Sequence, residues 1–122
     1  MRDYLYVEDH CTAIDLVLKK GKLGQTYCVG GDSERNTVQV SDSILTHLNK
    51  PASLKRHTID RPGHDPRYAI DHAKITRELG WKPSVTFEQG IQRTIAWYRD
   101  HQEWWRPISA KAEEVAEKYL KG

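Results

Sequence analysis

The chain has 122 residues, of which 38% are hydrophobic and 30% are charged. This length and composition are typical of one soluble globular domain with a modest core. The 19 basic and 17 acidic residues give a formal net charge of +2, which makes no case for nucleic acid as a partner. No run of 18 apolar residues is present, so no membrane span is predicted. Two cysteines are too few for a disulfide framework, and this low number favours a location in the reducing cytoplasm.

The first part of the chain alternates predicted strands with a helix. Residues 2–7 are rich in aromatic and β-branched side chains, so they predict a strand at the very start of the chain. Such a start is expected of a fragment of a longer protein. Residues 8–20 predict a helix that ends at Gly21, because apolar residues recur with spacings of four, three and four. These apolar residues are Val7, Cys11, Ile14 and Leu18. Residues 25–29 predict a short strand that runs into Gly30 and Gly31.

The middle of the chain carries weaker periodic signals. Residues 41–49 predict a helix with Ser41 as its N-cap. Residues 54–59 alternate enough to predict a strand. A helix over 72–79 follows, in which Asp71 is the expected cap, Ile75 and Leu79 are the expected buried residues, and Gly80 is the expected end.

The last part is predicted to be helical. Thr86 and Gln89 fit a capping box, which begins a helix with one apolar face; that face carries Phe87, Ile91, Ile95 and Tyr98. The tryptophans beside it are expected to close the core or an interface. A final amphipathic helix is predicted over 110–120. Strand–helix alternation followed by helices predicts an α/β chain.

The densest chemistry lies in residues 60–71. Pro62 and Gly63 predict a tight turn between Arg61 and His64. A turn that presents a guanidinium beside an imidazole suits a phosphate or diphosphate, because arginine offers a planar fork of donors to anionic oxygens. A charged surface turn without a ligand is the alternative.

Other candidate groups have simpler structural interpretations. Six histidines show no zinc-type spacing, so no metal site is predicted. Cys11 lies on the apolar stripe of its helix and is expected to be a buried structural thiol rather than a nucleophile. The polar loop 34–36 is equally compatible with solvated surface. Gly30 and Gly31 predict a turn, or a place where a ligand approaches the backbone.

Five motifs together carry a resemblance to a known family. They are Arg2–His10, Gly30–Gly31, Asp60–Asp65, Arg67–Asp71 and Glu78–Pro83. In this order the motifs resemble the dTDP-glucose 4,6-dehydratases, which are extended short-chain dehydrogenases/reductases acting on nucleotide sugars. The first motif alone is shared with nucleotide-sugar epimerases and decarboxylases, whereas the Asp60–Asp65 run favours the dehydratase. The resemblance covers nearly the whole chain and implies a substrate-binding portion over 1–108, followed by a helical tail over 109–122.

The resemblance implies a role in holding substrate. The family oxidises the sugar at C4 by hydride transfer to NAD, eliminates water across C5 and C6, and returns the hydride to C6. Arg2 matches an arginine that contacts the nucleotide diphosphate, and the segment from Asp60 to His64 matches the lining of the nucleotide end. The segment thus contributes Asp60, Arg61, Pro62, Gly63 and His64. The family also has an asparagine in the loop after the double glycine. In an ungapped comparison this position corresponds to Thr37, and Asn36 lies one residue before it; we assign the role to Asn36.

The chain lacks the family's catalytic and cofactor motifs. It contains no Gly-x-Gly-x-x-Gly and no Tyr-x-x-x-Lys, so it is interpreted as the C-terminal third of such an enzyme without a complete Rossmann domain. We therefore expect no catalytic residue, no NAD bound by this chain alone and no turnover. The expected partners are dTDP-glucose, the missing N-terminal half and possible further copies of the chain. A non-catalytic module that binds a nucleotide diphosphate or a protein remains the alternative, as does an epimerase or decarboxylase fragment.

Overall fold

The computed structural model describes residues 1–58 and 62–109. The α/β class predicted from the sequence is confirmed, with helices that outweigh a small sheet. The elements are β1 (Arg2–Asp3), α1 (Val7–Lys20), β2 (Glu34–Arg35), α2 (Thr37–His47), the 3₁₀ helix η1 (Ala52–Leu54), α3 (Ala73–Leu79) and α4 (Phe87–Asp100). Residues 102–109 are also helical. In the described part of the chain, no helix is long and apolar enough to cross a membrane.

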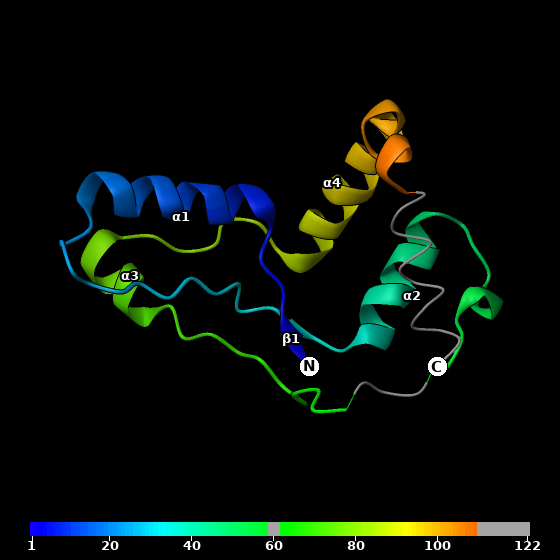
Figure 1. Cartoon of the computed structure of the whole chain (residues 1–122), viewed down its shortest axis with the longest axis horizontal. Helices are drawn as coiled ribbons and strands as arrows, with labels where there is room; N and C mark the ends of the chain where they lie inside the picture. Colours follow the sequence, from blue (N-terminus) through cyan, green and yellow to red (C-terminus); the bar gives the residue numbers. More distant parts are fainter. Residues whose placement is uncertain (59–61, 110–122) are drawn as a thin grey trace.

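The helices are arranged in two pairs with the sheet between them. Helices α1 and α3 contact each other at one end, and α2 contacts α4 at the other end (Figure 1). Strands β1 and β2 pair in antiparallel fashion, with Arg2 opposite Arg35 and Asp3 opposite Glu34. The N-terminal strand therefore lies between the two helix pairs (Figure 1).

The hydrophobic core lies between α1 and α3. Ala13 and Ile75 are completely buried, and Trp81 packs against them. The burial of Ile75 confirms the expectation from the sequence. Partly buried apolar side chains surround these three residues; they include Leu16 and Val17 of α1 and Leu79 of α3.

Helix α1 forms as predicted, but it buries a different stripe from the one expected. Its buried residues are Asp9 and Ala13, and they lie with Leu16 and Val17 on one helical face, since their spacing is four, three and one. The stripe on which the prediction was based points outward: Val7, Ile14 and Leu18 are exposed, as is Cys11. The prediction of a buried Cys11 is therefore wrong, because the helix has two apolar faces and only one is covered.

The strand predictions are mostly wrong. The strand expected over 2–7 is confined to Arg2–Asp3, and residues 25–29 are irregular. In place of the strand over 54–59, the described residues form η1 and an irregular segment. A strand exists only where a second strand supplies backbone partners, and the described part of the chain offers only the short pairing of β1 with β2.

The helix predictions in the second half fared better. The capping box of Thr86 and Gln89 begins α4 as predicted. Helix α3 ends at Gly80, whose φ of 75° places it in the left-handed region. Its N-cap is His72 rather than the predicted Asp71, although the Asp71 carboxylate accepts the Ala73 backbone N–H at 2.8 Å. Helix α2 begins four residues before the predicted Ser41 cap. The helix predicted over 110–120 lies outside the described residues.

Candidate anion-binding site

Two arginines face each other across the small sheet. Arg2 on β1 is directly opposite Arg35 on β2, and residues directly opposite in a ladder project their side chains from the same face. Like charges in that arrangement repel each other unless other groups compensate them. The pairing register thus concentrates positive charge at one place.

His64 joins this charge from a distant part of the sequence. Guanidinium Nη2 of Arg2 contacts Nε2 of His64, which is 62 residues away in the sequence. Because a guanidinium only donates, the imidazole accepts in this contact. Arg2 is also held by Met1, whose carbonyl oxygen accepts from Nη1 at 2.7 Å, and its guanidinium lies 4.5 Å from the centre of the Tyr68 ring. The Arg2 side chain is therefore held by contacts with three neighbouring residues.

These residues line a cavity of about 480 Å³. Its basic side chains come from Arg2, Arg35 and His64, and its hydroxyl groups come from Thr37 and Thr58. Asp65 also lines the cavity, but its carboxylate accepts the hydroxyl of Tyr68. An arrangement of guanidinium forks and hydroxyl donors around an open space is suited to phosphate oxygens.

The structure puts Asn36 and Thr37 in different surroundings. Asn36 is the N-cap of α2: its side-chain oxygen accepts the Gln39 backbone N–H at 2.8 Å, and the Gln39 side chain accepts the Asn36 N–H at 2.8 Å. Thr37, the first residue of the helix, lines the cavity. Asn36 thus has a structural task at the end of the helix, while the neighbouring residue faces the candidate site.

The turn predicted around Pro62 and Gly63 leads directly to His64. Gly63 has a φ of 71°, a left-handed conformation that residues with a Cβ adopt only with strain. Gly63 therefore serves the predicted turn. Asp60 and Arg61, which the sequence analysis also assigns to the site, lie outside the described residues.

A bidentate ion pair holds the segment that follows His64 to β2. Arg67 donates from Nε and Nη2 to the two carboxylate oxygens of Glu34, at 2.7 and 2.6 Å. Hydrogen bonding from Arg67 lowers the pKa of Glu34, and the same bond raises the pKa of Arg67. The pair lies next to the ladder that carries Arg35, so it fixes the histidine segment beside the two arginines.

The aspartates of the first motif do not line the cavity; both hold backbone amides. The Asp3 carboxylate accepts from the N–H groups of Gly31 and Ser33, each at 2.8 Å. Asp9 is buried and accepts from Ser84 and Val85, as described below. In this motif, therefore, Arg2 lines the cavity, whereas the two aspartates hold backbone amides.

The double glycine allows two backbone segments to approach it closely. A Cβ on Gly30 would come within 2.4 Å of the Ile70 carbonyl oxygen, and one on Gly31 within 2.1 Å of the Tyr4 carbonyl oxygen. The close approach that the sequence suggested is therefore made by the chain's own backbone. These glycines do not form an open cradle for a dinucleotide phosphate.

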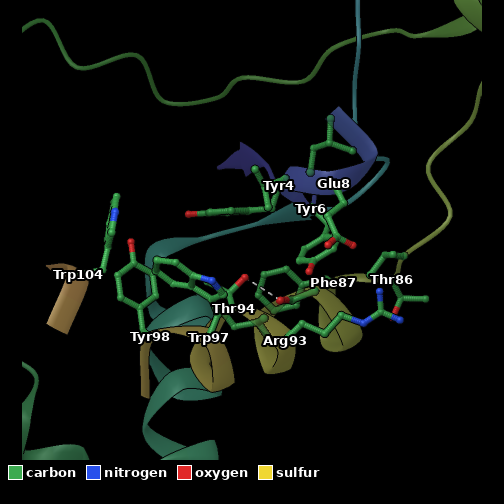
Figure 2. A pocket seen from close by; sticks show the side chains of 15 residues that line it. Tyr4, Tyr6, Glu8, Thr86, Phe87, Arg93, Thr94, Trp97, Tyr98 and Trp104 are labelled. Atoms are coloured by element: carbon green, nitrogen blue, oxygen red, sulfur yellow. Dashed lines mark hydrogen bonds between the residues drawn. The ribbon is translucent and has the colours of Figure 1, made fainter. Parts of the chain in front are cut away.

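A second cavity, of about 580 Å³, has a different lining. We call it the aromatic groove; it lies between the segment that follows β1 and helix α4. Figure 2 shows Trp97, Tyr98 and Trp104 toward one end of the groove and Thr86 and Arg93 toward the other. Of the predicted site residues that the structure describes, none lines it. Its aromatic walls suit apolar packing better than an anion.

Comparisons with known proteins agree with the motifs. The family model described as GDP-mannose 4,6 dehydratase matches residues 1–94. A dTDP-glucose 4,6-dehydratase of Xanthomonas campestris is 49% identical over 113 residues, which cover 85% of this chain and 32% of the relative.

Two solved structures resemble the chain closely. A dTDP-glucose 4,6-dehydratase of Bacillus anthracis in complex with NAD matches with a TM-score of 0.81 and 46% identity, over 87% of this chain and 33% of that one. The dTDP-glucose 4,6-dehydratase DesIV of Streptomyces venezuelae with NAD and TYD bound matches with a TM-score of 0.82 and 40% identity, over the same shares. The chain spans about a third of the length of these relatives. It belongs to the GDP-mannose 4,6 dehydratase family, as a partial region similar to the dTDP-glucose 4,6-dehydratases.

Proposed function

We propose that this chain is the part of a dTDP-glucose 4,6-dehydratase that holds the nucleotide diphosphate end of dTDP-glucose. The observation that carries the proposal is the contact between Arg2 and His64 at a cavity also lined by Arg35. Two motifs that resemble the family's substrate contacts, far apart in the sequence, meet there. The similarity to the dTDP-glucose 4,6-dehydratases supports dTDP-glucose as the proposed substrate.

The proposed contribution of the chain is binding and orientation. Arg2 donates to phosphate oxygens as a charged, planar donor, and His64, whose Nε2 accepts from Arg2, lines the cavity beside it. The family resemblance adds Asp60 and Arg61 to the proposed contacts. Contacts with the unreactive diphosphate hold the sugar in place for chemistry that other residues perform.

A hydroxyl contact from the start of α2 completes the proposed site. Of the two positions weighed from the sequence, Thr37 lines the cavity, whereas the side-chain oxygen of Asn36 accepts the Gln39 N–H. Thr37 is therefore our preferred contact, and Asn36 acts through the cap that fixes the helix start. The first backbone N–H groups of a helix add positive potential toward an anion.

NAD does not fit the residues that the structure describes. The sheet is a two-stranded antiparallel pair, not a parallel sheet that leads into a glycine-rich helix start. Gly30 and Gly31 are closely approached by neighbouring backbone. We propose that NAD belongs to another part of the complete enzyme, and that this chain alone catalyses no dehydration.

The proposed partner of the chain is the nucleotide-binding part of that enzyme. Val7, Ile14 and Leu18 form an exposed apolar stripe on α1, which is the outer of its two apolar faces. A helix that is apolar on two sides is normally covered on both. The second cover is proposed to come from the nucleotide-binding part, with association of identical chains as the alternative.

A non-catalytic module that binds a nucleotide diphosphate is the second candidate function. The same cavity supports it, and it differs from the first candidate only in needing no dehydratase partner. If the purified chain binds dTDP-glucose, supplying the nucleotide-binding part separates the two candidates. Restored formation of the 4-keto product supports the dehydratase, whereas binding without restored activity supports the module.

Calorimetric titration of the chain with dTDP-glucose tests the proposal. The unmodified chain is expected to bind, and Arg2→Gln is expected to weaken binding about tenfold or more, because a charge-assisted bond is lost. Arg77→Gln is the matched control, since Arg77 is an exposed arginine of α3 paired only loosely with Glu78 at 3.6 Å. Thymidine, which lacks the diphosphate, is expected not to bind measurably.

Two outcomes contradict the proposal. The first is no binding of dTDP-glucose by the unmodified chain, and the second is equal affinity for the unmodified chain and Arg2→Gln. Formation of the 4-keto product by the purified chain alone would refute the expectation that it is inactive.

A further inference from the structure

Arg35 is a cationic residue of the cavity to which neither the motifs nor the family resemblance gives a role. It lines the same cavity as Arg2 and His64 and lies directly across the ladder from Arg2. Its side chain is only 32% exposed. A second guanidinium placed opposite the first raises the electrostatic potential of the cavity and gives a second set of planar donors.

Helix α4 holds the Arg35 side chain on two sides. Nη2 of Arg35 donates to Oε1 of Glu88 at 3.0 Å, and the guanidinium lies 5.0 Å from the centre of the Phe87 ring. Nη1 donates to the carbonyl oxygen of Glu34 at 2.9 Å. The ring supports the guanidinium plane, while Glu88 occupies part of its donor fork.

The bond to Glu88 is of a kind that an anion can displace. The Glu88 side chain is 69% exposed, and exposed ion pairs contribute little to stability because water competes for both charges. A diphosphate carries more negative charge than one carboxylate and presents several acceptor oxygens. Exchange of Glu88 for phosphate needs only a side-chain movement, with the Phe87 ring still beneath the guanidinium.

We propose that Arg35 is a further arginine contact to the diphosphate, opposite Arg2, and that Glu88 competes with the ligand for its guanidinium. This inference rests on the proposed function, because it assumes that the anion occupies the cavity of Arg2 and His64. It adds a specificity-determining residue and assigns α4 an influence on affinity through Glu88. Removing the competitor should therefore tighten binding, whereas removing Arg35 should weaken it.

Calorimetric titration with thymidine diphosphate tests both parts. Arg35→Gln is expected to raise Kd about tenfold, because a charge-assisted contact is lost. Glu88→Gln is expected to lower Kd about two- to fivefold, the range that corresponds to an exposed ion pair. Arg77→Gln and Asp15→Asn are matched controls, because each neutralises one member of an exposed pair on another helix, and both are expected to leave Kd unchanged.

A third variant guards against a folding defect. Arg35→Lys keeps the positive charge but lacks the planar fork, so it should bind more weakly than the unmodified chain and more tightly than Arg35→Gln. Circular dichroism of each variant should match that of the unmodified chain. If Arg35→Gln does not fold, two measurements still decide the question. The Kd of Arg35→Lys should be higher than that of the unmodified chain, and the Kd of Glu88→Gln should be lower.

The outcomes separate this inference from the proposed function. No binding of thymidine diphosphate by the unmodified chain would refute both. Binding that Arg2→Gln weakens but Arg35→Gln and Arg35→Lys leave unchanged would refute only the role of Arg35. Weakening by Arg35→Gln together with an unchanged or raised Kd for Glu88→Gln would refute the competition.

Discussion

Asp9 shows how one residue of a motif can stabilise the fold while another, Arg2, lines the candidate site. The charge of Asp9 complements the positive end of the helix dipole at the start of α1, and its carboxylate also binds groups outside the helix. Oδ1 accepts the Ser84 hydroxyl at 2.6 Å, and Oδ2 accepts the backbone N–H groups of Ser84 and Val85 at 3.1 and 3.0 Å. Asp9 thereby ties α1 to the segment that leads into α4.

Replacing this carboxylate should destabilise the chain. Asp9→Asn removes the charge and substitutes an amide donor for one acceptor, which leaves the partly buried donors of Ser84 and Val85 without a full set of partners. The expected loss is about 1.5–3 kcal/mol of unfolding free energy, measured by urea denaturation followed by circular dichroism. Glu8→Gln is the control, because Glu8 is exposed at the adjacent position. Equal stability of the two variants would show that the Asp9 bonds contribute nothing specific.

The residues of the site were partly accessible from the sequence. Arg2 and His64 belong to motifs that resemble a known family, so they could be named in advance. Arg35 could not, because its place opposite Arg2 depends on the register of a ladder between segments that are far apart in the sequence. Thr37 was weighed from an ungapped comparison, but only the fold distinguishes a helix cap from a residue that lines the cavity.

At the scale of elements, local signals predicted helices better than strands. The capping box at Thr86 and the glycine stop at Gly80 depend on interactions within a few residues, so the local sequence is enough to predict them. A strand depends on a partner that the local sequence does not specify. Residues 25–29 have the composition of a strand, yet in the described structure no strand pairs with them.

The start of α2 was missed although its signal is local. Asn36 and Gln39 form a capping box with the same three-residue spacing as Thr86 and Gln89. The polar loop 34–36 was considered equally compatible with solvated surface, and Ser41 was predicted as the cap. Ser41 instead lies within the helix, where its hydroxyl donates to the Val38 carbonyl oxygen at 2.9 Å.

The pair of Glu34 and Arg67 connects β2 with the His64 segment, and its titration is testable. Because hydrogen bonding to Arg67 lowers the Glu34 pKa below its ordinary value of 4.5, the pair stabilises the fold above that value. Its contribution is lost as pH falls through the lowered pKa. The ¹³C signal of the Glu34 carboxyl should therefore titrate below pH 4.5 in the unmodified chain and nearer 4.5 in Arg67→Gln. An identical midpoint in both would show that the pair does not form.

At the scale of the whole molecule, the buried core is small and the exposed apolar surface is large. Ala13, Ile75 and Trp81 are the buried hydrophobic residues of the described part. By contrast, Leu18 is 83% exposed and Leu23 is fully exposed. The aromatic groove adds further apolar surface. Unpartnered apolar surface on this scale favours association or marginal stability.

The chain alone should therefore associate or unfold at moderate temperature. Analytical ultracentrifugation across a concentration series is expected to show species larger than the monomer, or else thermal unfolding should begin early. The double variant Ile14→Ser and Leu18→Ser, on the outer face of α1, should reduce association without loss of helix content. A monodisperse monomer with a cooperative thermal transition would contradict this prediction.

The central claim is that a diphosphate binds where Arg2, Arg35 and His64 meet. Mapping of amide chemical shifts in the ¹⁵N-labelled chain during addition of thymidine diphosphate tests it most directly. We predict saturable shifts that are largest at Arg2, Arg35, Thr37 and His64, with little change in the aromatic groove around Trp97. Shifts confined to the aromatic groove, or no saturable shift at any residue, would contradict the claim.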